Sequence, residues 1–388
     1  MQKLSLVIRL GLMVSFLAAC APQVTATQAL IATTISSPTP APDQNIILFR
    51  ANPQRTGVYS FPAIRMLPEI TWQTKVNDTW LMPPLLADAI LYTGSGDGVL
   101  YALDAQTAEQ LWSKVGFGQL ESTGAIAGDT IITAGYNQTV KAMDRITGEE
   151  RWSYTTGYGV QGAPLIVDDR VFIATDHEVY NLDLKSGELI WKVPTGTEGA
   201  YMGAPAYEDG VIYTTGGKLL LALEADSGKE LWRTQKEEMF LGPTVANGLV
   251  YVGNFDRKLY AFDQSSGEEK WSFDGKEVFW SSPAASEDKI FAGNARTVYA
   301  LDAQTGELIW SFDAESPSVS EPLLSDGVLY ISYSSHEFSR GPRHLYALDA
   351  KTGEQLWAFE SISTFLPAPA LGEGVLYLTS TGEIIALE

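Results

Sequence analysis

Few side chains in this sequence have the chemistry for catalysis or metal binding. The 388 residues include one cysteine and three histidines, His177, His336 and His344. His336 and His344 fall in one stretch, "YSSHEFSRGPRH" at 333–344, where a metal site would still need a third ligand in a fixed geometry. No carboxylate pair and no Ser-His-Asp order stands out. The sequence therefore predicts no catalytic residue and no metal ligand.

A glycine motif at 157–162, "GYGVQG", has the G-x-G-x-x-G spacing of dinucleotide-binding turns. In those turns the motif leads into a helix, whose N-terminus faces the pyrophosphate. Here the following segment, "APLIVDD", has the composition of a strand. We therefore expect a loop between two strands and no nucleotide site.

The single cysteine, Cys20, ends a typical export signal. Residues 1–20, "MQKLSLVIRLGLMVSFLAAC", carry Lys3 and Arg9 and an apolar stretch too short to cross a bilayer. Their end, "LAAC", resembles the bacterial lipobox, which implies cleavage before Cys20 and lipidation of its sulfur. The alternative is an ordinary signal peptide with a chance cysteine. Ala21 stands where many inner-membrane lipoproteins have aspartate, which favours the outer membrane in a cell with two membranes.

Residues 21–45 are rich in Thr, Ala, Ser and Pro and have no hydrophobic period. This composition predicts a disordered tether between the lipid anchor and a folded domain at 46–388. The chain has 47 acidic and 26 basic residues, a net charge of −21. Such a surface repels phosphates, which argues against nucleic acid as a partner.

A pattern of about forty residues recurs from residue 70 onward. Each copy ends in a segment such as "LYALDAQTAEQLW" at 100–112 or "VYALDAQTGELIW" at 298–310. The tryptophans that close the copies are 39 to 47 residues apart: Trp112, Trp152, Trp191, Trp232, Trp271, Trp310 and Trp357. A period near forty with short β-type segments is typical of propeller blades. We expect these tryptophans to pack between neighbouring blades.

The turn before each tryptophan has the composition of a tight connection between two strands. An Asp-type side chain can accept backbone N–H groups there, and a glycine such as Gly306 can take positive φ. Ala108 occupies the glycine position in the first copy. We expect its turn to be strained or differently shaped.

The last segment, "TGEIIALE" at 381–388, matches the third strand of a repeat and has no tryptophan strand after it. A matching fourth strand occurs near the other end, where "ITWQTKV" at 70–76 places Trp72 forty residues before Trp112. The two segments therefore predict an eighth blade built from both ends of the domain, which leaves no long exposed edge. The predicted fold is all-β, an eight-bladed propeller whose last blade is closed by the N-terminal strand.

The motif A-x-D-x-x-T-G-x-x-x-W, "ALDAQTGELIW" at 300–310, resembles the repeat of pyrroloquinoline-quinone (PQQ) propellers. The segment "FRANPQRTGVY" at 49–59 is similar to the stretch that precedes such propellers in envelope proteins. One branch of this family is the quinoprotein dehydrogenases, which bind PQQ and Ca²⁺ on the propeller axis. Another is non-catalytic and includes the propeller lipoprotein of the outer-membrane β-barrel assembly machinery, whose order of signal, lipidated cysteine, tether and blades this chain shares.

The resemblance implies features that a quinoprotein needs and this sequence lacks. Many quinoproteins stack the cofactor on a disulfide of adjacent cysteines, and no cysteine follows Cys20. Most copies here also have near-minimal length, so little chain is left to build a cofactor pocket. We therefore expect no cofactor; PQQ and Ca²⁺ belong only to the alternative of a quinoprotein dehydrogenase.

The predicted blades divide the connections between two faces. The turn face carries the first-to-second and third-to-fourth turns, with acidic residues such as Asp88, Asp129 and Asp326. The hairpin face carries the second-to-third hairpins and the inter-blade loops. Its predicted partner-binding residues are aromatic and basic, as in binding hot spots: Trp80, Tyr201, Phe240, Phe279, Trp280, Phe365, Arg340 and Arg343. The alternative is that the aromatics close the central channel.

The sequence as a whole predicts a non-catalytic, lipid-anchored propeller outside the cytoplasm, on the cell membrane or the outer membrane. It would be a monomer or a subunit of a hetero-complex and bind an envelope protein or peptide, with a role in outer-membrane protein assembly. Two alternatives stay open: a PQQ-dependent dehydrogenase, and a surface sensor or adhesion module.

Overall fold

The computed structural model describes residues 46–388 except 197–202, 315–319, 333–342 and 362–366. The chain separates into two compact units, residues 1–39 and 40–388, and the described residues belong to the second. The predicted signal peptide, Cys20 and the tether lie outside the described residues. Within the described ranges no helix is long and apolar enough to cross a membrane.

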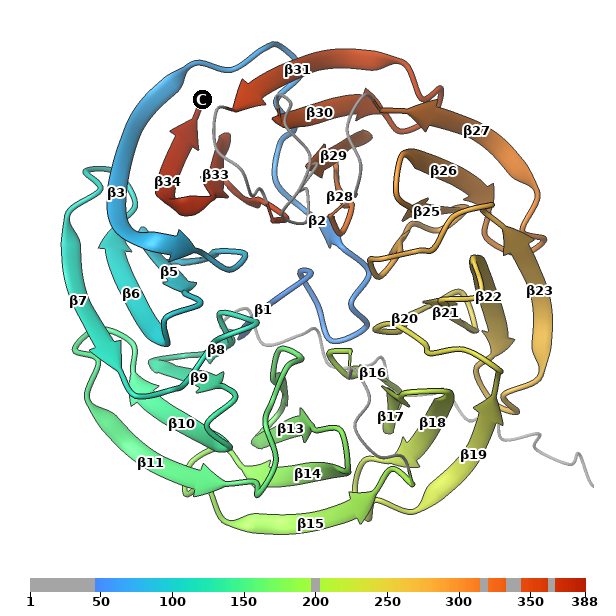
Figure 1. Cartoon of the computed structure of the whole chain (residues 1–388), viewed down its shortest axis with the longest axis horizontal. Helices are drawn as coiled ribbons and strands as arrows, with labels where there is room; N and C mark the ends of the chain where they lie inside the picture. The colour runs from blue at the N-terminus through green and yellow to red at the C-terminus, as the bar shows by residue number, and fades with distance from the viewer. Residues whose placement is uncertain (1–45, 197–202, 315–319, 333–342, 362–366) are drawn as a thin grey trace, which may run out of the picture. The chain divides into compact units, whose positions relative to one another are not determined.

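Eight antiparallel sheets of four principal strands stand around a central axis (Figure 1). The innermost strands are β4 (Leu85–Ala87), β8 (Ala125–Ala127), β12 (Leu165–Val167), β16 (Ala206–Glu208), β20 (Thr244–Ala246), β24 (Ala284–Ala285), β28 (Leu323–Ser325) and β32 (Ala370–Gly372). The second strands are β5 (Ile90–Gly94), β9 (Thr130–Ala134), β13 (Arg170–Ala174), β17 (Val211–Gly216), β21 (Leu249–Gly253), β25 (Lys289–Gly293), β29 (Val328–Ser332) and β33 (Val375–Thr379).

The outer half of each blade follows the repeat seen in the sequence. The third strands are β6 (Val99–Asp104), β10 (Thr139–Asp144), β14 (Glu178–Asp183), β18 (Leu219–Glu224), β22 (Lys258–Asp263), β26 (Thr297–Asp302), β30 (Arg343–Asp349) and β34 (Thr381–Leu387). The outermost strands are β7 (Gln110–Val115), β11 (Glu150–Thr155), β15 (Leu189–Pro194), β19 (Glu230–Gln235), β23 (Glu269–Asp274), β27 (Leu308–Asp313), β31 (Gln355–Ser361) and β3 (Ile70–Trp80). Blades 1 to 8 are numbered in chain order of their innermost strands, from β4 to β32.

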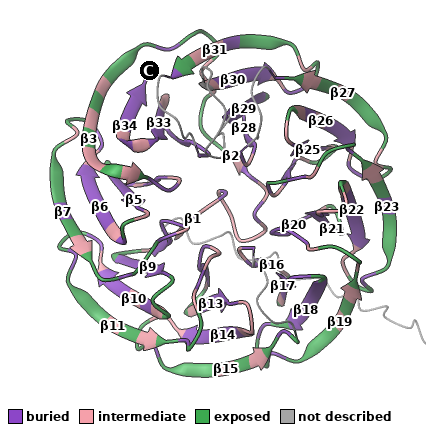
Figure 2. Cartoon of the chain, viewed as in Figure 1, coloured by how far each residue is buried: buried purple, intermediate pink, exposed green. Residues whose placement is uncertain are grey.

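The core lies between the blades, where the second and third strands are buried on both faces (Figure 2). The outermost strands alternate between exposed and partly buried residues because only one of their faces packs on a neighbour. Two strands lie outside this scheme. β1 (Ile46–Leu48) pairs with β8, and β2 (Val58–Tyr59) pairs in parallel with β28.

Each repeat tryptophan joins its blade to the next one. The indole N–H donates to a main-chain carbonyl at the third-to-fourth turn of the following blade, or at Ile64 in the case of Trp357, over 2.9 to 3.2 Å. A tyrosine of the second strand often shares that carbonyl: Tyr92 and Trp112 both donate to Arg145 O. The prediction that these tryptophans are structural is consistent with this contact.

The turn glycines fit against the tryptophans of the preceding blade. A Cβ added at Gly306, where φ is +72°, would lie 2.6 Å from the Trp271 ring. Ala108 adopts the same left-handed conformation, with φ of 62°. The predicted strain at this position is therefore present in the backbone, since a side chain disfavours that region. The predicted role of the aspartate is also seen, because Asp302 Oδ1 accepts the Gln304 and Thr305 N–H groups.

The eighth blade is closed as the sequence predicts. β3, the blue outer strand in Figure 1, runs antiparallel to the red β34, with Trp72 opposite Ala386. Glu69 and Glu388 exchange main-chain hydrogen bonds of 2.9 and 3.0 Å at the end of the pair. At this junction Ile64 supplies the carbonyl that accepts the Trp357 indole. The ring therefore has no open blade edge between its two ends.

The connections sort between the faces as predicted. In blade 1 the third-to-fourth turn bonds to the first-to-second turn, because Ala105 N donates to Ala89 O. In blade 2 Arg145 N makes the same bond to Asp129 O. The loop before blade 2 instead contacts the hairpin of blade 1 through Leu120 N and Ser95 O. These contacts place the acidic turns on one face and the hairpins on the other.

Candidate functional site

The centre of the ring is occupied by the chain's own residues 46–65, which we call the axial strap. Its strand β1 lies on blade 2 and its strand β2 on blade 7, so the strap crosses the middle of the ring (Figure 1). Between these strands, carbonyls of Pro53, Gln54, Thr56 and Gly57 accept main-chain N–H groups from blades 4, 5, 6 and 7. The strap is thus bonded along most of its course to the innermost strands.

Arg55 fixes the strap to blades 3 and 4. Its side chain is 1% exposed, and its guanidinium donates to the carbonyls of Ala163, Pro164 and Pro205 at 3.3, 2.9 and 3.0 Å. A fourth bond, of 2.5 Å, reaches Phe49 O within the strap. Burial lowers the pKa of Arg55 to about 9, and the neighbouring charge of Arg50 acts in the same direction. The group is still a cation at pH 7.

Arg50 fixes the strap to blade 6. Its guanidinium donates to Ser282 O at 2.9 Å, to Pro283 O, and to Arg55 O at 2.9 Å. Burial lowers the pKa of Arg50 to about 10, while the charge of Glu321 opposes that shift. Burial likewise raises the pKa of Tyr59 to about 12. The centre of the ring therefore holds two buried cations whose hydrogen bonds go mainly to peptide oxygens.

The channel wall that meets these cations is poor in main-chain donors. Seven of the eight innermost strands are preceded by a proline: Pro84, Pro164, Pro205, Pro243, Pro283, Pro322 and Pro369. Proline has no N–H, so each removes a donor from the ring and leaves carbonyl oxygens. Blade 2 has Gly124 at this position, and it is the blade that pairs with β1. We call this ring of carbonyls the proline collar.

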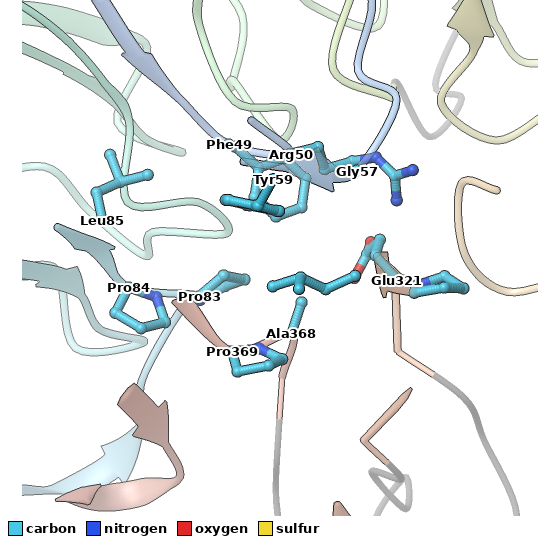
Figure 3. A pocket seen from close by; sticks show the side chains of 12 residues that line it. Phe49, Arg50, Gly57, Tyr59, Pro83, Pro84, Leu85, Glu321, Ala368 and Pro369 are labelled. Carbon is cyan, nitrogen blue, oxygen red and sulfur yellow. The ribbon is translucent and has the colours of Figure 1, made fainter. Parts of the chain in front are cut away.

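A small cavity lies beside the strap, next to blades 7, 8 and 1 (Figure 3). Its walls include Arg50 and Tyr59 of the strap, Pro84, Glu321 and Pro369. The volume is about 10 Å³, which has room for about one water molecule. This cavity is too small for a fused tricyclic quinone. The described residues also contain no group of three or more His, Cys, Asp or Glu that could hold a metal ion.

The predicted partner-binding residues divide into three sets. Trp80 and Trp280 are 42% and 48% exposed, and both lie on the hairpin face, Trp80 beside Gly96 and Trp280 beside Phe255. Tyr201, Phe365 and Arg340 lie outside the described residues, and the side chain of Arg343 is not described either. The third set is the pair Phe240 and Phe279.

The prediction is wrong for Phe240 and Phe279. Both side chains are 0% exposed. Each forms a bridge to the asparagine of the neighbouring hairpin and packs edge-on or tilted against a tyrosine. They belong to the core near the hairpin face: Leu241, next to Phe240, is buried as well, and only Trp280, next to Phe279, stays exposed.

The remaining chemical candidates behave as structural residues. His177 packs at a tilt against Tyr158, with ring centroids 4.1 Å apart, and lies 3.7 Å from the Asp176 carboxylate. His344 lies against Tyr346 in β30, and His336 is outside the described residues. The "GYGVQG" motif connects β11 to β12 without a helix, as predicted.

Sequence reasoning missed the axial strap. The segment at 49–59 stands out in the sequence only through its resemblance, and nothing in its composition says that two arginines will be buried. The proline that recurs before the innermost strands was a usable signal, because it marks a donor-poor ring where the blades converge.

Comparison with known proteins agrees with this architecture. The profile of the PQQ_2 family, described as outer membrane protein assembly factor BamB, matches residues 68–123, 116–202, 175–278 and 276–388. These matches cover most of the chain. The chain belongs to this family. BamB of Yersinia pestis is 26% identical over 212 residues, which is 50% of this chain and 53% of that protein. The chain spans about half the length, or less, of the curated relatives it matches first.

Solved structures give the same fold at low identity. BamB from Moraxella catarrhalis superposes with a TM-score of 0.65 and 17% identity, over 83% of this chain and 100% of that one. The quinohemoprotein alcohol dehydrogenase of Comamonas testosteroni superposes with a TM-score of 0.72 and 12% identity, over 88% and 80%. At such identities the likeness concerns the fold alone. It does not distinguish a binding BamB-type propeller from a redox propeller.

Proposed function

We propose that this PQQ_2-family propeller is a non-catalytic binding scaffold of the bacterial envelope that serves in outer-membrane protein assembly. The observation that carries the proposal is the filled axis: where a quinoprotein needs space for its cofactor, this chain has its own strap and a cavity of about 10 Å³. The family match to BamB supports the assembly role. We propose accordingly that the protein binds no quinone and no metal.

We further propose that Cys20 carries the lipid that holds the protein at the membrane outside the cytoplasm. The support is the "LAAC" segment, its position after an apolar stretch, and the absence of any other cysteine in the sequence. The net charge of −21 fits an envelope protein with a protein partner and disfavours nucleic acid.

The hairpin face is the proposed docking surface, with Trp80 and Trp280 as its anchors. Tryptophan is enriched in contact surfaces and among the residues that dominate binding energy. Both side chains lie on the face opposite the acidic turns. The partner class is an envelope protein or peptide, with a barrel insertase as the first candidate.

Affinity capture from solubilised envelopes tests the docking surface. The full chain with Trp80→Ala and Trp280→Ala is compared with wild type and with a control carrying Leu189→Ala and Leu308→Ala, which removes similarly exposed side chains from outermost strands. We expect the tryptophan variant to retain less than a tenth of the partner, about 1.4 kcal/mol of binding free energy, and the control to retain it. Equal capture by both variants would remove the hairpin face from the proposal.

A dye-linked dehydrogenase assay separates the scaffold from the redox alternative. Wild-type protein with added PQQ and Ca²⁺ should show no turnover and no shift in melting temperature. Turnover, or a quinone-dependent rise in melting temperature, would favour the dehydrogenase. Recovery of a polysaccharide or an extracellular ligand in place of an envelope protein would favour the sensor or adhesion module.

A further inference from the structure

The axial strap is held by polar recognition, unlike an ordinary core segment. Five guanidinium hydrogen bonds of Arg50 and Arg55 reach carbonyls of the ring, at Ala163, Pro164, Pro205, Ser282 and Pro283. All five acceptors are collar prolines or the residues directly before them. A planar guanidinium with several donors matches such a set of oxygens, whereas an apolar side chain would leave them unpaired.

The strap itself adopts a conformation that it would not choose alone. Arg50, Ala51 and Arg55 have φ of 63°, 72° and 59°, the left-handed region that disfavours side chains. The two arginines are 3% and 1% exposed, which costs hydration of their charge. The hydrogen bonds that offset both costs form only when the strap is seated in the ring. A bound ligand behaves in the same way.

The contacts of the strap are also unevenly distributed. Blades 2 to 7 bond to it through β1, the two arginines, the strap carbonyls and β2. Blades 8 and 1 border the cavity of about 10 Å³, and Ile47 of the strap packs on the apolar cluster between blades 1 and 2. Seven of the eight interblade tryptophan contacts, such as those of Trp72 and Trp112, do not involve the strap; the eighth, from Trp357, ends on Ile64 O. The ring is therefore closed mainly by contacts outside the strap, such as the β3–β34 pair and the other seven tryptophans.

We propose that the proline collar is a binding site for an arginine-bearing polypeptide segment, and that the axial strap, residues 46–65, is its resident, replaceable ligand. The class of ligand is a segment with two arginines about five residues apart around a left-handed turn, supplied here by the same chain. The collar selects the guanidinium group because its donors reach several carbonyls at once; a lysine ammonium would reach fewer. This inference concerns the axis and is independent of the docking role of the hairpin face.

A nicked full-length protein tests the replaceability of the strap. A protease site is introduced between Met66 and Leu67, which are 82% and 59% exposed, so that cleavage turns the strap into a separate peptide. The nicked protein is then incubated with a fluorescent peptide of residues 46–66 and passed through gel filtration. We expect the ring to stay folded and to take up the labelled peptide in exchange for its own strap.

Variant peptides test the chemistry of recognition. A competitor with Arg55→Lys should bind at least ten-fold more weakly than the wild-type peptide, and one with Arg65→Lys should bind within about three-fold of it. Arg65 is the matched control because it is half exposed and makes its ion pair with Asp326 at the surface. Unfolding of the nicked ring, a folded ring that takes up no peptide, or equal competition by the Arg55→Lys peptide would each overturn the proposal.

Chemical rescue gives a second readout on the uncut chain. Arg55→Ala should gain melting temperature with millimolar ethylguanidinium and not with ethylammonium, while wild type and Arg65→Ala should respond alike to both. The same response of Arg55→Ala to both compounds would show that the site does not distinguish guanidinium from ammonium, and would overturn the proposal. If Arg55→Ala does not fold, Arg50→Ala provides the same test at the bonds to Ser282 and Pro283.

Discussion

Removing Arg55 should destabilise the propeller far more than removing an arginine from its surface. Arg55→Ala leaves four carbonyl oxygens without their donor, three of them in the ring and one in the strap. Each unpaired buried acceptor costs about 1 kcal/mol at the low end of the usual range, because water can enter the vacated space. We therefore expect a loss of about 3 to 5 kcal/mol in the free energy of unfolding, since four acceptors lose their donor at once.

Equilibrium urea unfolding followed by both tryptophan fluorescence and circular dichroism measures this loss. The two probes must coincide before a free energy is assigned, since a domain of this size need not unfold in one step. Arg55→Lys keeps the charge without the planar donor set and should fall between wild type and Arg55→Ala. Arg65→Ala should stay within about 0.5 kcal/mol of wild type, because its partner Asp326 is exposed.

This expectation is refuted if Arg55→Ala and Arg65→Ala unfold at the same urea concentration and the dependence of the unfolding free energy on urea is unchanged. It would mean that the collar carbonyls are satisfied equally well without the guanidinium, and that the strap contributes its main-chain bonds alone. A changed slope would instead indicate that the variant alters how much surface unfolding exposes.

The turns, the buried tyrosines and the proposed lipid anchor each give a further prediction. Ala108→Gly should stabilise the protein by up to about 1 kcal/mol, because glycine adopts the left-handed conformation without strain. Gly306→Ala should destabilise it by about 1 to 3 kcal/mol, since the new Cβ would meet a tryptophan ring. The midpoints of urea unfolding check both. Burial raises the pKa of Tyr251 and Tyr330 to about 12, so above pH 10 the unfolded state releases protons that the folded state keeps. The free energy of unfolding should therefore fall between pH 10 and 12, by about 2 to 3 kcal/mol for each tyrosine. A melting temperature that does not change over that pH range would contradict this. Cys20→Ser should move the protein from the membrane to the soluble fraction, and unchanged fractionation after carbonate washing would argue against lipidation.

The sequence by itself determined the blades. The spacing of the tryptophans, the Asp and Gly of each turn and the position of Trp72 are local patterns, and each acts within one blade or between neighbours. Such patterns can be recognised in the sequence because each repeat uses the same short-range contacts, so the same residues recur at the same spacing. The closure of blade 8 could be predicted for the same reason, since two incomplete repeats at the ends of the domain complement one another.

Only the tertiary structure decided what fills the axis and which aromatics reach the surface. Arg50 and Arg55 are ordinary charged residues in the sequence. They become buried only because eight innermost strands, seven of them preceded by proline, begin around the propeller axis. Phe279 and Trp280 are adjacent in the sequence, yet Phe279 is buried and Trp280 is exposed, because Phe279 packs on Tyr299 of its own blade while Trp280 lies at the surface. Burial at a point where many distant segments meet is a property of their convergence in space, and no local pattern contains it.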